Sequence, residues 1–411
     1  MQINERITLL LQQMNSNVYE KETEIGLSLL AALAGESILL LGPPGVAKSM
    51  VARRLKYAFV NAKAFEYLMS RFSTPDEIFG PVSISKLKDA DIYERITDGY
   101  LPTADVVFLD EIWKSGPAIQ NSLLTVINEK IYRNGKNEEH LPLKLLVAAS
   151  NELPTKGEGL EALWDRFLIR IVSTCIEQEN TFYQMLLDES TPYNQEINPD
   201  LQISEAEYQE WQRNILQLDC DKQVLASISF IRKGLNAISL PDTNLKRQVY
   251  VSDRRWKKIL HLMKASAFAH NQNSVTLNDL FIIHHCLWNE ADEREEIRKL
   301  VLQSLFFDIE KELTRISEGI SASMKASHAH LGMRYAQPVQ RELNLQAADQ
   351  NFEALLENVF ATLTTRTLQL KQNMFLSVSE KKEIEAYAAT LRKQVAFIRV
   401  DIRKLMYGDE A

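Results

Sequence analysis

The feature that most constrains the fold of this 411-residue chain is a glycine- and proline-containing loop between an apolar run and a helical pattern. Residues 42–49 read Gly-Pro-Pro-Gly-Val-Ala-Lys-Ser. Small residues let backbone N–H groups wrap around phosphate oxygens, a lysine reaches the β- and γ-phosphates, and a hydroxyl holds Mg²⁺. Ala47 replaces the usual second glycine, which we expect to be tolerated with a negative φ. The loop predicts a phosphate site at a helix N-terminus.

The first half of the chain alternates short apolar runs with helical patterns, which predicts an α/β domain with a mostly parallel sheet. Uninterrupted apolar runs are typical of strands buried on both faces. The runs lie at 38–41, 106–109 and 145–148, with weaker candidates at 65–68 and 168–172. Helical patterns cover 49–60 and 118–128. We also expect two β-hairpins, which pair 82–87 with 93–97 and 130–133 with 141–146.

The second half contains few residues that end helices. Only Pro338 lies beyond residue 241, and residues 176–290 contain amphipathic helical patterns without strand runs. Apolar residues spaced by three or four continue to the end of the chain and predict helices that need a partner surface. We therefore expect three regions: an α/β domain at 1–175, a small all-α domain at 176–290 and a helical extension at 291–411.

Polar residues follow two of the predicted strands and add to the phosphate site. Asp110 and Glu111 end one strand, where the first carboxylate can support Mg²⁺ and the second can polarise an attacking water. Asn151 ends the next strand and could orient that water, although such an asparagine alone is more often a turn residue. Arg166 follows a helical segment, and without context it is equally well a surface ion-pair partner.

Composition excludes several classes of function. Lys and Arg number 47 against 55 Asp and Glu, so the net charge of −8 argues against a dominant grip on nucleic acid. Three widely spaced cysteines indicate no disulfide framework, and no signal peptide or 18-residue apolar stretch is visible, so we expect a cytoplasmic protein without membrane insertion. His284 and His285 should face different directions on a helix and have no accompanying carboxylate pair, so we expect no transition-metal site there.

Together these motifs resemble the AAA+ ATPases. The loop variant at 42–49 and the segment 72–80, Phe-Ser-Thr-Pro-Asp-Glu-Ile-Phe-Gly, resemble the MoxR branch. Within it, residues 67–81, 108–116, 148–154 and 250–258 look similar to the RavA group, regulatory ATPases that work with a von Willebrand A-domain protein called ViaA. The resemblance covers about 5–290. It implies a P-loop AAA+ core with a parallel sheet flanked by helices, followed by a small all-α lid domain and a helical C-terminal region.

The resemblance also assigns roles to matching positions, with ATP and Mg²⁺ as cofactors. Glu111 and Asn151 (sensor 1) would act in hydrolysis, Arg166 would be the arginine finger, and Arg254 would be sensor 2, with adjacent Arg255 as the alternative. Ser49 and Asp110 would hold the metal. The nucleotide-binding residues would be Gly42, Pro43, Pro44, Gly45, Val46, Ala47, Lys48, Ser49 and Met50.

An arginine finger acts on a neighbouring subunit, so the resemblance implies a homo-oligomer, with a hexameric ring as the family precedent. The two inserted hairpins would face the ring pore. We expect an Mg²⁺-dependent ATPase that remodels or assembles partner proteins in a chaperone-like way, with a von Willebrand A-domain partner and an unidentified client. The alternatives are a nucleotide-dependent scaffold with little turnover and a nucleic-acid-linked motor.

Overall fold

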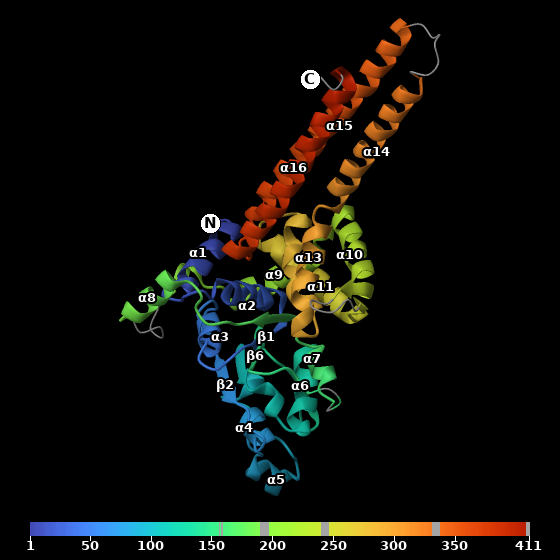
Figure 1. Cartoon of the computed structure of the whole chain (residues 1–411). Helices are drawn as coiled ribbons and strands as arrows, with labels where there is room; N and C mark the ends of the chain where they lie inside the picture. Colours follow the sequence, from blue (N-terminus) through green and yellow to red (C-terminus); the bar gives the residue numbers. More distant parts are fainter. Residues whose placement is uncertain (156, 158, 190–196, 240–245, 331–337, 408–411) are drawn as a thin grey trace.

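The computed structural model describes residues 1–407 apart from 156, 158, 190–196, 240–245 and 331–337 (Figure 1). A five-stranded sheet forms its N-terminal part, and every neighbouring pair of strands is parallel. In spatial order the strands are β2 (Ala64–Leu68), β3 (Val106–Asp110), β6 (Leu145–Ser150), β1 (Ser37–Leu41) and β7 (Ile169–Val172). β1, β3 and β6 are almost wholly buried, which confirms that the uninterrupted apolar runs are central strands.

Helices flank this sheet, as expected, and α2 (Glu22–Ala34) and α3 (Lys48–Lys56) contact its strands. The other helices of this part are α1 (Ile3–Asn15), α4 (Pro75–Phe79), α5 (Ile84–Ala90), α6 (Pro117–Glu129) and α7 (Glu161–Trp164), with short 3₁₀ turns η1 (Leu101–Thr103) and η2 (Ile112–Lys114). The helix expected over 49–60 ends earlier, at Lys56. The strand order places β1 between β6 and β7, so the loop after β1 opens at the switch point of the sheet, where α/β proteins bind ligands.

The first expected hairpin is wrong. Residues 84–90 form α5, and only an isolated antiparallel bridge joins Val82 to Arg95. The helix wins because the Ser83 hydroxyl caps it by accepting the Lys86 N–H, and residues 84–90 contain good helix formers. The second hairpin exists, but its strands are β4 (Ile131–Asn134) and β5 (Asn137–His140). A two-residue turn at 135–136 fixes that register, so the returning strand begins earlier than the expected 141.

The lid region that follows is mainly helical. Its helices are α8 (Glu179–Leu187), α9 (Glu205–Gln217), α10 (Lys222–Gly234), α11 (Asp253–Ala269), α12 (His284–Leu287) and α13 (Arg294–Ser304), with 3₁₀ turns η3 (Pro199–Leu201), η4 (Leu235–Ala237), η5 (Leu277–Asp279), η6 (Phe281–Ile283) and η7 (Ala291–Glu293). Two-residue strands join in pairs: β8 (Asp219–Cys220) with β11 (Ser274–Val275), and β9 (Ile238–Ser239) with β10 (Lys246–Arg247). α11 packs against α2 and α9, which seats the lid on the α/β part.

The tail consists of three long helices that project from the lid (Figure 1). They are α14 (Phe307–His330), α15 (Pro338–Lys371) and α16 (Val378–Tyr407), and each contacts the other two. The base of the tail is fastened to the lid: the Asn373 side chain donates to the Asn278 carbonyl at 2.7 Å, and the Met374 N–H donates to His270 at 3.0 Å. The sequence did not predict how the tail helices pack. The division of the chain into three regions at residues 175 and 290 stays a prediction.

Candidate nucleotide site

The loop between β1 and α3 is held against the neighbouring strand ends. The Gly42 N–H donates to the Ser150 carbonyl at 3.0 Å, and a Cβ at Gly42 would lie 2.2 Å from the Ser173 carbonyl oxygen, so only glycine fits there. At Gly45, φ is +84° and nothing lies within 4 Å of the position a Cβ would take. The loop is therefore anchored at its start and open at its tip, and the first turn of α3 presents free N–H groups beside it.

Ala47 does not have the negative φ that the sequence led us to expect. Its φ is +62°, in the left-handed region, at the N-cap of α3. An L-residue there costs roughly 1–2 kcal/mol, so the loop enters its helix under local strain. Glu111 is also left-handed, with φ +54°, where β3 passes into η2. Strained residues on both sides of one site are typical of functional positions.

Three of the predicted site residues form one chain of hydrogen bonds. The Lys48 ammonium donates to Asn151 Oδ1 at 2.8 Å, and Asn151 Nδ2 donates to Glu111 Oε1 at 2.6 Å. The ammonium also donates to the loop carbonyls of Gly42 and Pro43. Burial lowers the pKa of Lys48, while the negative charges of Asp110 and Glu111 partly counter that shift. The strand-end asparagine therefore connects the lysine with the candidate catalytic carboxylate.

The residues predicted to hold Mg²⁺ offer suitable chemistry. Ser49 lies in the first turn of α3, and Asp110 is the last residue of β3, partly buried, with Oδ1 accepting the Glu111 N–H at 2.9 Å. Mg²⁺ prefers hard oxygen ligands and usually takes one or two carboxylates together with phosphate oxygens and waters. The hydroxyl and carboxylate oxygens at this sheet edge fit that ion when a triphosphate supplies the remaining ligands.

The predicted arginines belong to a different cluster, centred on Asp165. Arg254 Nη2 lies 2.6 Å from Asp165 Oδ2, and Arg255 Nη2 lies 2.5 Å from Asp165 Oδ1. Arg255 is buried and also donates to Asn289, whereas 44% of the Arg254 side chain is exposed. The next residue, Arg166, donates through Nη1 to the Ala162 carbonyl, and its buried Nε has no partner among the described residues. The structure therefore pairs Arg254 and Arg255, the two sensor-2 candidates, with Asp165 next to the expected arginine finger, and not with the chain of hydrogen bonds at Lys48.

A cavity of about 400 Å³ adjoins the loop at Gly45, Val46, Ala47 and Met50. Its other walls come from segments far apart in the sequence. They are Asn17, Val18, Tyr19, Lys21, Thr174, Cys175, Ile176, Phe182, Met185 and Asp188. The Tyr19 hydroxyl donates to Asp188 at 2.8 Å, and Lys21 donates to the Thr174 carbonyl at 2.7 Å, which joins the segment before α2 to the segments on either side of α8.

Family models match most of the chain. A model described as the MoxR domain in the MoxR-vWA-beta-propeller ternary systems matches residues 5–213, and a model described as an AAA lid domain matches 223–301. The chain belongs to the MoxR-type AAA+ ATPases. ATPase chemistry follows at the level of this family, and the α/β core with a lid is confirmed.

Known proteins similar to this MoxR-type chain come from archaea, a virus and a bacterium. Two uncharacterized proteins of Methanocaldococcus jannaschii are similar to it. The first is 38% identical over 75% of this chain and 75% of the relative. The second is 40% identical over 69% of this chain and 71% of the relative. A structural protein of the Acidianus two-tailed virus is 36% identical over 37% of this chain and 25% of its own length. A solved structure of a candidate ATPase from Cytophaga hutchinsonii superposes with a TM-score of 0.57 at 18% identity, covering 74% of this chain and 94% of that one, which shows a shared fold.

Sequence reasoning predicted one side of the cavity in this MoxR-type site, the loop residues Gly45, Val46, Ala47 and Met50, and missed the other walls. Tyr19, Ile176 and Phe182, for example, carry no local motif that marks them. The only available signal was the position of the loop, since the cavity lies beside it.

Among the helices that the structure describes, none combines the length and apolar content that a bilayer crossing requires.

Proposed function

We propose that this MoxR-type protein hydrolyses ATP with Mg²⁺ and uses the cycle to remodel or assemble partner proteins. The hydrogen-bonded chain from Lys48 through Asn151 to Glu111 carries the proposal, because it places a cation, an amide and a carboxylate at one sheet edge. Glu111 accepts the proton of the attacking water, Asn151 orients that water, and Lys48 neutralises phosphate charge. Bound Mg²⁺, held by Ser49 and Asp110, supplies charge neutralisation and orientation of the phosphates.

The cavity beside the loop would take the base and ribose of the nucleotide. Its walls are mostly apolar, with Val18, Ile176 and Met50 beside polar groups from Tyr19 and Asp188. An apolar cavity with a few convergent polar groups is the usual form of a small-molecule site. Gly42, Pro43 and Pro44 are not among the cavity walls. In this proposal they belong to the part of the loop that wraps the phosphates.

We further propose that the active unit is a ring, a hexamer by family precedent. Arg166 then acts on the nucleotide of a neighbouring subunit, which is consistent with its Nε having no partner among the described residues. Sensor 2 is Arg254 in this proposal, because its side chain is 44% exposed and can change partner, whereas Arg255 is buried between Asp165 and Asn289.

The family description supports a von Willebrand A-domain protein as a partner, since the matched model is that of a system containing MoxR, vWA and β-propeller components. The narrower resemblance to the RavA group, with its ViaA partner, stays a prediction. All three cysteines are free in the structure, in keeping with the proposed cytoplasmic location.

Two substitutions test the hydrolysis. Glu111→Gln should retain binding of a fluorescent ATP analogue and lower phosphate release by at least about 100-fold, because the general base is lost. Lys48→Ala should lose nucleotide binding as well. Glu318→Gln, at an exposed carboxylate on α14, is the matched control and should hydrolyse ATP at the wild-type rate. Phosphate release by Glu111→Gln equal to that of Glu318→Gln would overturn the assignment.

A mixing experiment tests whether Arg166 acts on the nucleotide of a neighbouring subunit. Arg166→Ala and Lys48→Ala rings should each be inactive, and mixed rings should recover part of the activity, because a Lys48-intact site can meet an Arg166-intact neighbour. Mixtures without any recovered hydrolysis would refute the trans role. A wild-type protein that binds ATP tightly without releasing phosphate at any protein concentration would favour the scaffold alternative.

A further inference from the structure

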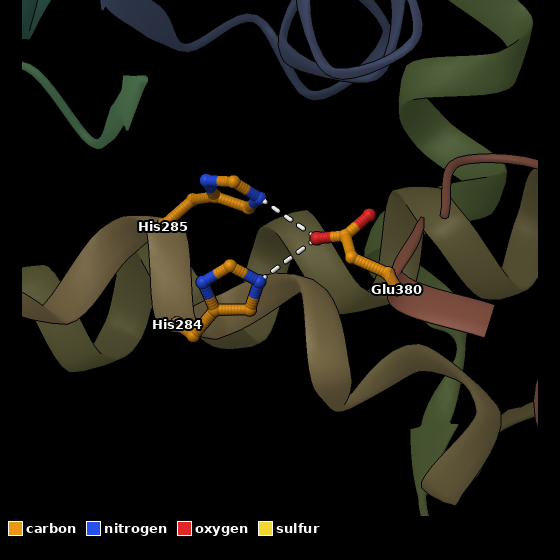
Figure 2. Close-up of side chains that lie close together, drawn as sticks. All are labelled: His284, His285 and Glu380. Carbon is orange, nitrogen blue, oxygen red and sulfur yellow. Dashed lines mark hydrogen bonds and ion pairs between the residues drawn. The ribbon is translucent and has the colours of Figure 1, made fainter. Parts of the chain in front are cut away.

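Two adjacent histidines of the lid and one glutamate of the tail meet at a single point, outside the nucleotide site (Figure 2). His284 Nε2 lies 2.9 Å from Glu380 Oε1, and His285 Nε2 lies 3.1 Å from the same oxygen. The expectation that the two imidazoles face different directions was wrong, since both reach the same oxygen. A single carboxylate, 95 and 96 residues away in the sequence, joins them. All three side chains are at most a tenth exposed.

We propose that His284, His285 and Glu380 form a binding site for one divalent transition-metal ion of the Zn²⁺ class, which fastens the tail to the lid. Two imidazole nitrogens and one carboxylate oxygen are a known three-ligand set for zinc, with water in the fourth position. The ligand atoms all lie within 4.8 Å of one another. Around a tetrahedral ion with bonds of 2.0–2.1 Å, ligand atoms are about 3.3 Å apart. The two nitrogen-to-oxygen contacts must therefore open by a few tenths of an ångström, and the two imidazole nitrogens, which lie within 4.8 Å of each other, must take up the same spacing.

The arrangement of the carboxylate supports a metal more than a simple hydrogen-bonded clasp. Glu380 Oε2 accepts the N–H and the hydroxyl of Ser377, each at 2.8 Å, in a capping box at the start of α16. This fixes the orientation of the carboxylate and leaves Oε1 directed at both imidazoles (Figure 2). Because both imidazoles converge on that one oxygen, one ion can replace two hydrogen bonds, and Ser377 acts as the outer partner that metal-binding carboxylates usually have.

The nitrogen of each imidazole that would bind the ion already faces the shared carboxylate oxygen, since both contacts run from Nε2 to Glu380 Oε1. An imidazole that now donates through Nε2 only needs to carry its proton on Nδ1 to free Nε2 for the ion.

Two nearby cations, Arg298 and the neighbouring Lys381, have to be weighed against this proposal. Arg298 lies close enough to His284 to lower its pKa, and such a charge opposes a bound cation. Its guanidinium, however, is paired with Glu383 of α16, with Nη2 at 2.5 Å from the carboxylate. The pair keeps the local charge close to balanced, and it joins lid and tail next to the proposed site.

The test uses the full chain without nucleotide, stripped by a chelator and dialysed. Zn²⁺ is titrated in competition with a chromophoric chelator. We expect one Zn²⁺ per chain, and about 100-fold weaker binding or worse in Glu380→Gln, because the loss of a ligand exceeds the effect of losing an outer partner. The glutamine keeps one oxygen that can accept from both imidazoles, but its NH₂ group then faces the Ser377 N–H, so circular dichroism of the variant has to show a wild-type fold before its binding is compared. His140→Gln, at an exposed histidine in β5, is the control and should bind as the wild type does.

Two further measurements keep the outcome decisive. Co²⁺ loaded into the wild type should give the visible absorption of a low-coordinate nitrogen and oxygen site, whereas a thiolate-to-cobalt band would assign the ion to the exposed thiol of Cys175 and overturn the proposal. Zn²⁺ should raise the melting temperature of wild type and of His140→Gln but not that of Glu380→Gln. No saturable Zn²⁺ binding by the wild type, or equal binding by Glu380→Gln, would also overturn it.

Discussion

Asp165→Asn should loosen the junction between the α/β part and the lid. Asp165 is the shared partner of Arg254 and Arg255, and the charge of Arg255 in particular holds its pKa below the usual value although burial alone would raise it. The Arg255 side chain is only 3% exposed. Removing the carboxylate from such a cation costs about 3–5 kcal/mol, and the remaining acceptor on Asn289, at 3.1 Å, favours the lower end of that range. The half-exposed Arg254 pair adds at most about 1 kcal/mol.

Native-state hydrogen exchange in the first turn of α11 measures this loss. The Trp256 N–H donates to the Ser252 carbonyl at 3.0 Å, so it reports opening of the helix start next to both arginines. A loss of about 3 kcal/mol corresponds to roughly 100-fold faster exchange when opening is local. Arg254→Ala should change the rate by less than about fivefold, and Asp165→Asn with Arg255→Met should recover part of the loss because no cation is left without a partner.

The reasoning would be refuted if the Trp256 N–H of Asp165→Asn exchanged at a rate within a few-fold of the wild-type rate. It would equally be refuted by a larger effect of Arg254→Ala than of Asp165→Asn, since the buried arginine is supposed to dominate. Local exchange is the appropriate measure because a chain with several regions need not unfold in a single two-state step.

Two other predictions concern strain and pH. Ala47→Gly should stabilise the protein by up to about 1 kcal/mol, because glycine removes the energetic cost of the left-handed backbone at this position and that gain exceeds the added entropy of the unfolded chain. Ala52→Gly inside α3 should instead destabilise the protein by about 1 kcal/mol. Thermal melts of both variants check this. Burial raises the pKa of Asp279 to about 7, above its unfolded value of 3.8, so the folded state binds the extra proton and stability should fall as pH rises from about 4 to 7. Asp279→Asn should lose that dependence, and melting temperatures that fall equally in both proteins between pH 4 and 7 would contradict it.

Local patterns predicted the centre of the fold well. The apolar runs at 38–41, 106–109 and 145–148 became β1, β3 and β6, because a strand buried on both faces needs no information from distant residues. The loop at 42–49 was readable for the same reason. The prediction failed at residues 84–90, where a serine cap outweighed the hairpin pattern, and at Ala47, whose backbone conformation is imposed by the turn into α3.

The candidate site was predictable only where it follows the sheet. Asn151 and Glu111 meet because both follow strands that end at the same sheet edge, and the sequence shows those ends. The rest of the cavity and the Glu380 cluster could not be predicted, since no motif connects their parts: the cavity joins segments within 17–21, 45–50 and 174–188, and Glu380 lies 95 and 96 residues from the two histidines. The arginines near Asp165 show an intermediate case, in which the residues were singled out correctly while their partner in this structure was not foreseen.

The contacts of Lys48 indicate how nucleotide binding would reach the rest of the site. Its ammonium is now shared among the Gly42 and Pro43 carbonyls and Asn151. A phosphate that takes this ammonium must compete with these three oxygens and with the Ser150 carbonyl at 3.4 Å, so it also weakens the hydrogen bond from Lys48 to Asn151. The asparagine is then left with Glu111, the residue that must select a water. Since Glu111 has a strained backbone at φ +54°, a small shift in its one side-chain amide partner can change its orientation. In the proposed site, nucleotide binding would thus reach the carboxylate through the Asn151 amide at Oε1, while Lys114 Nζ stays 3.4 Å from Oε2.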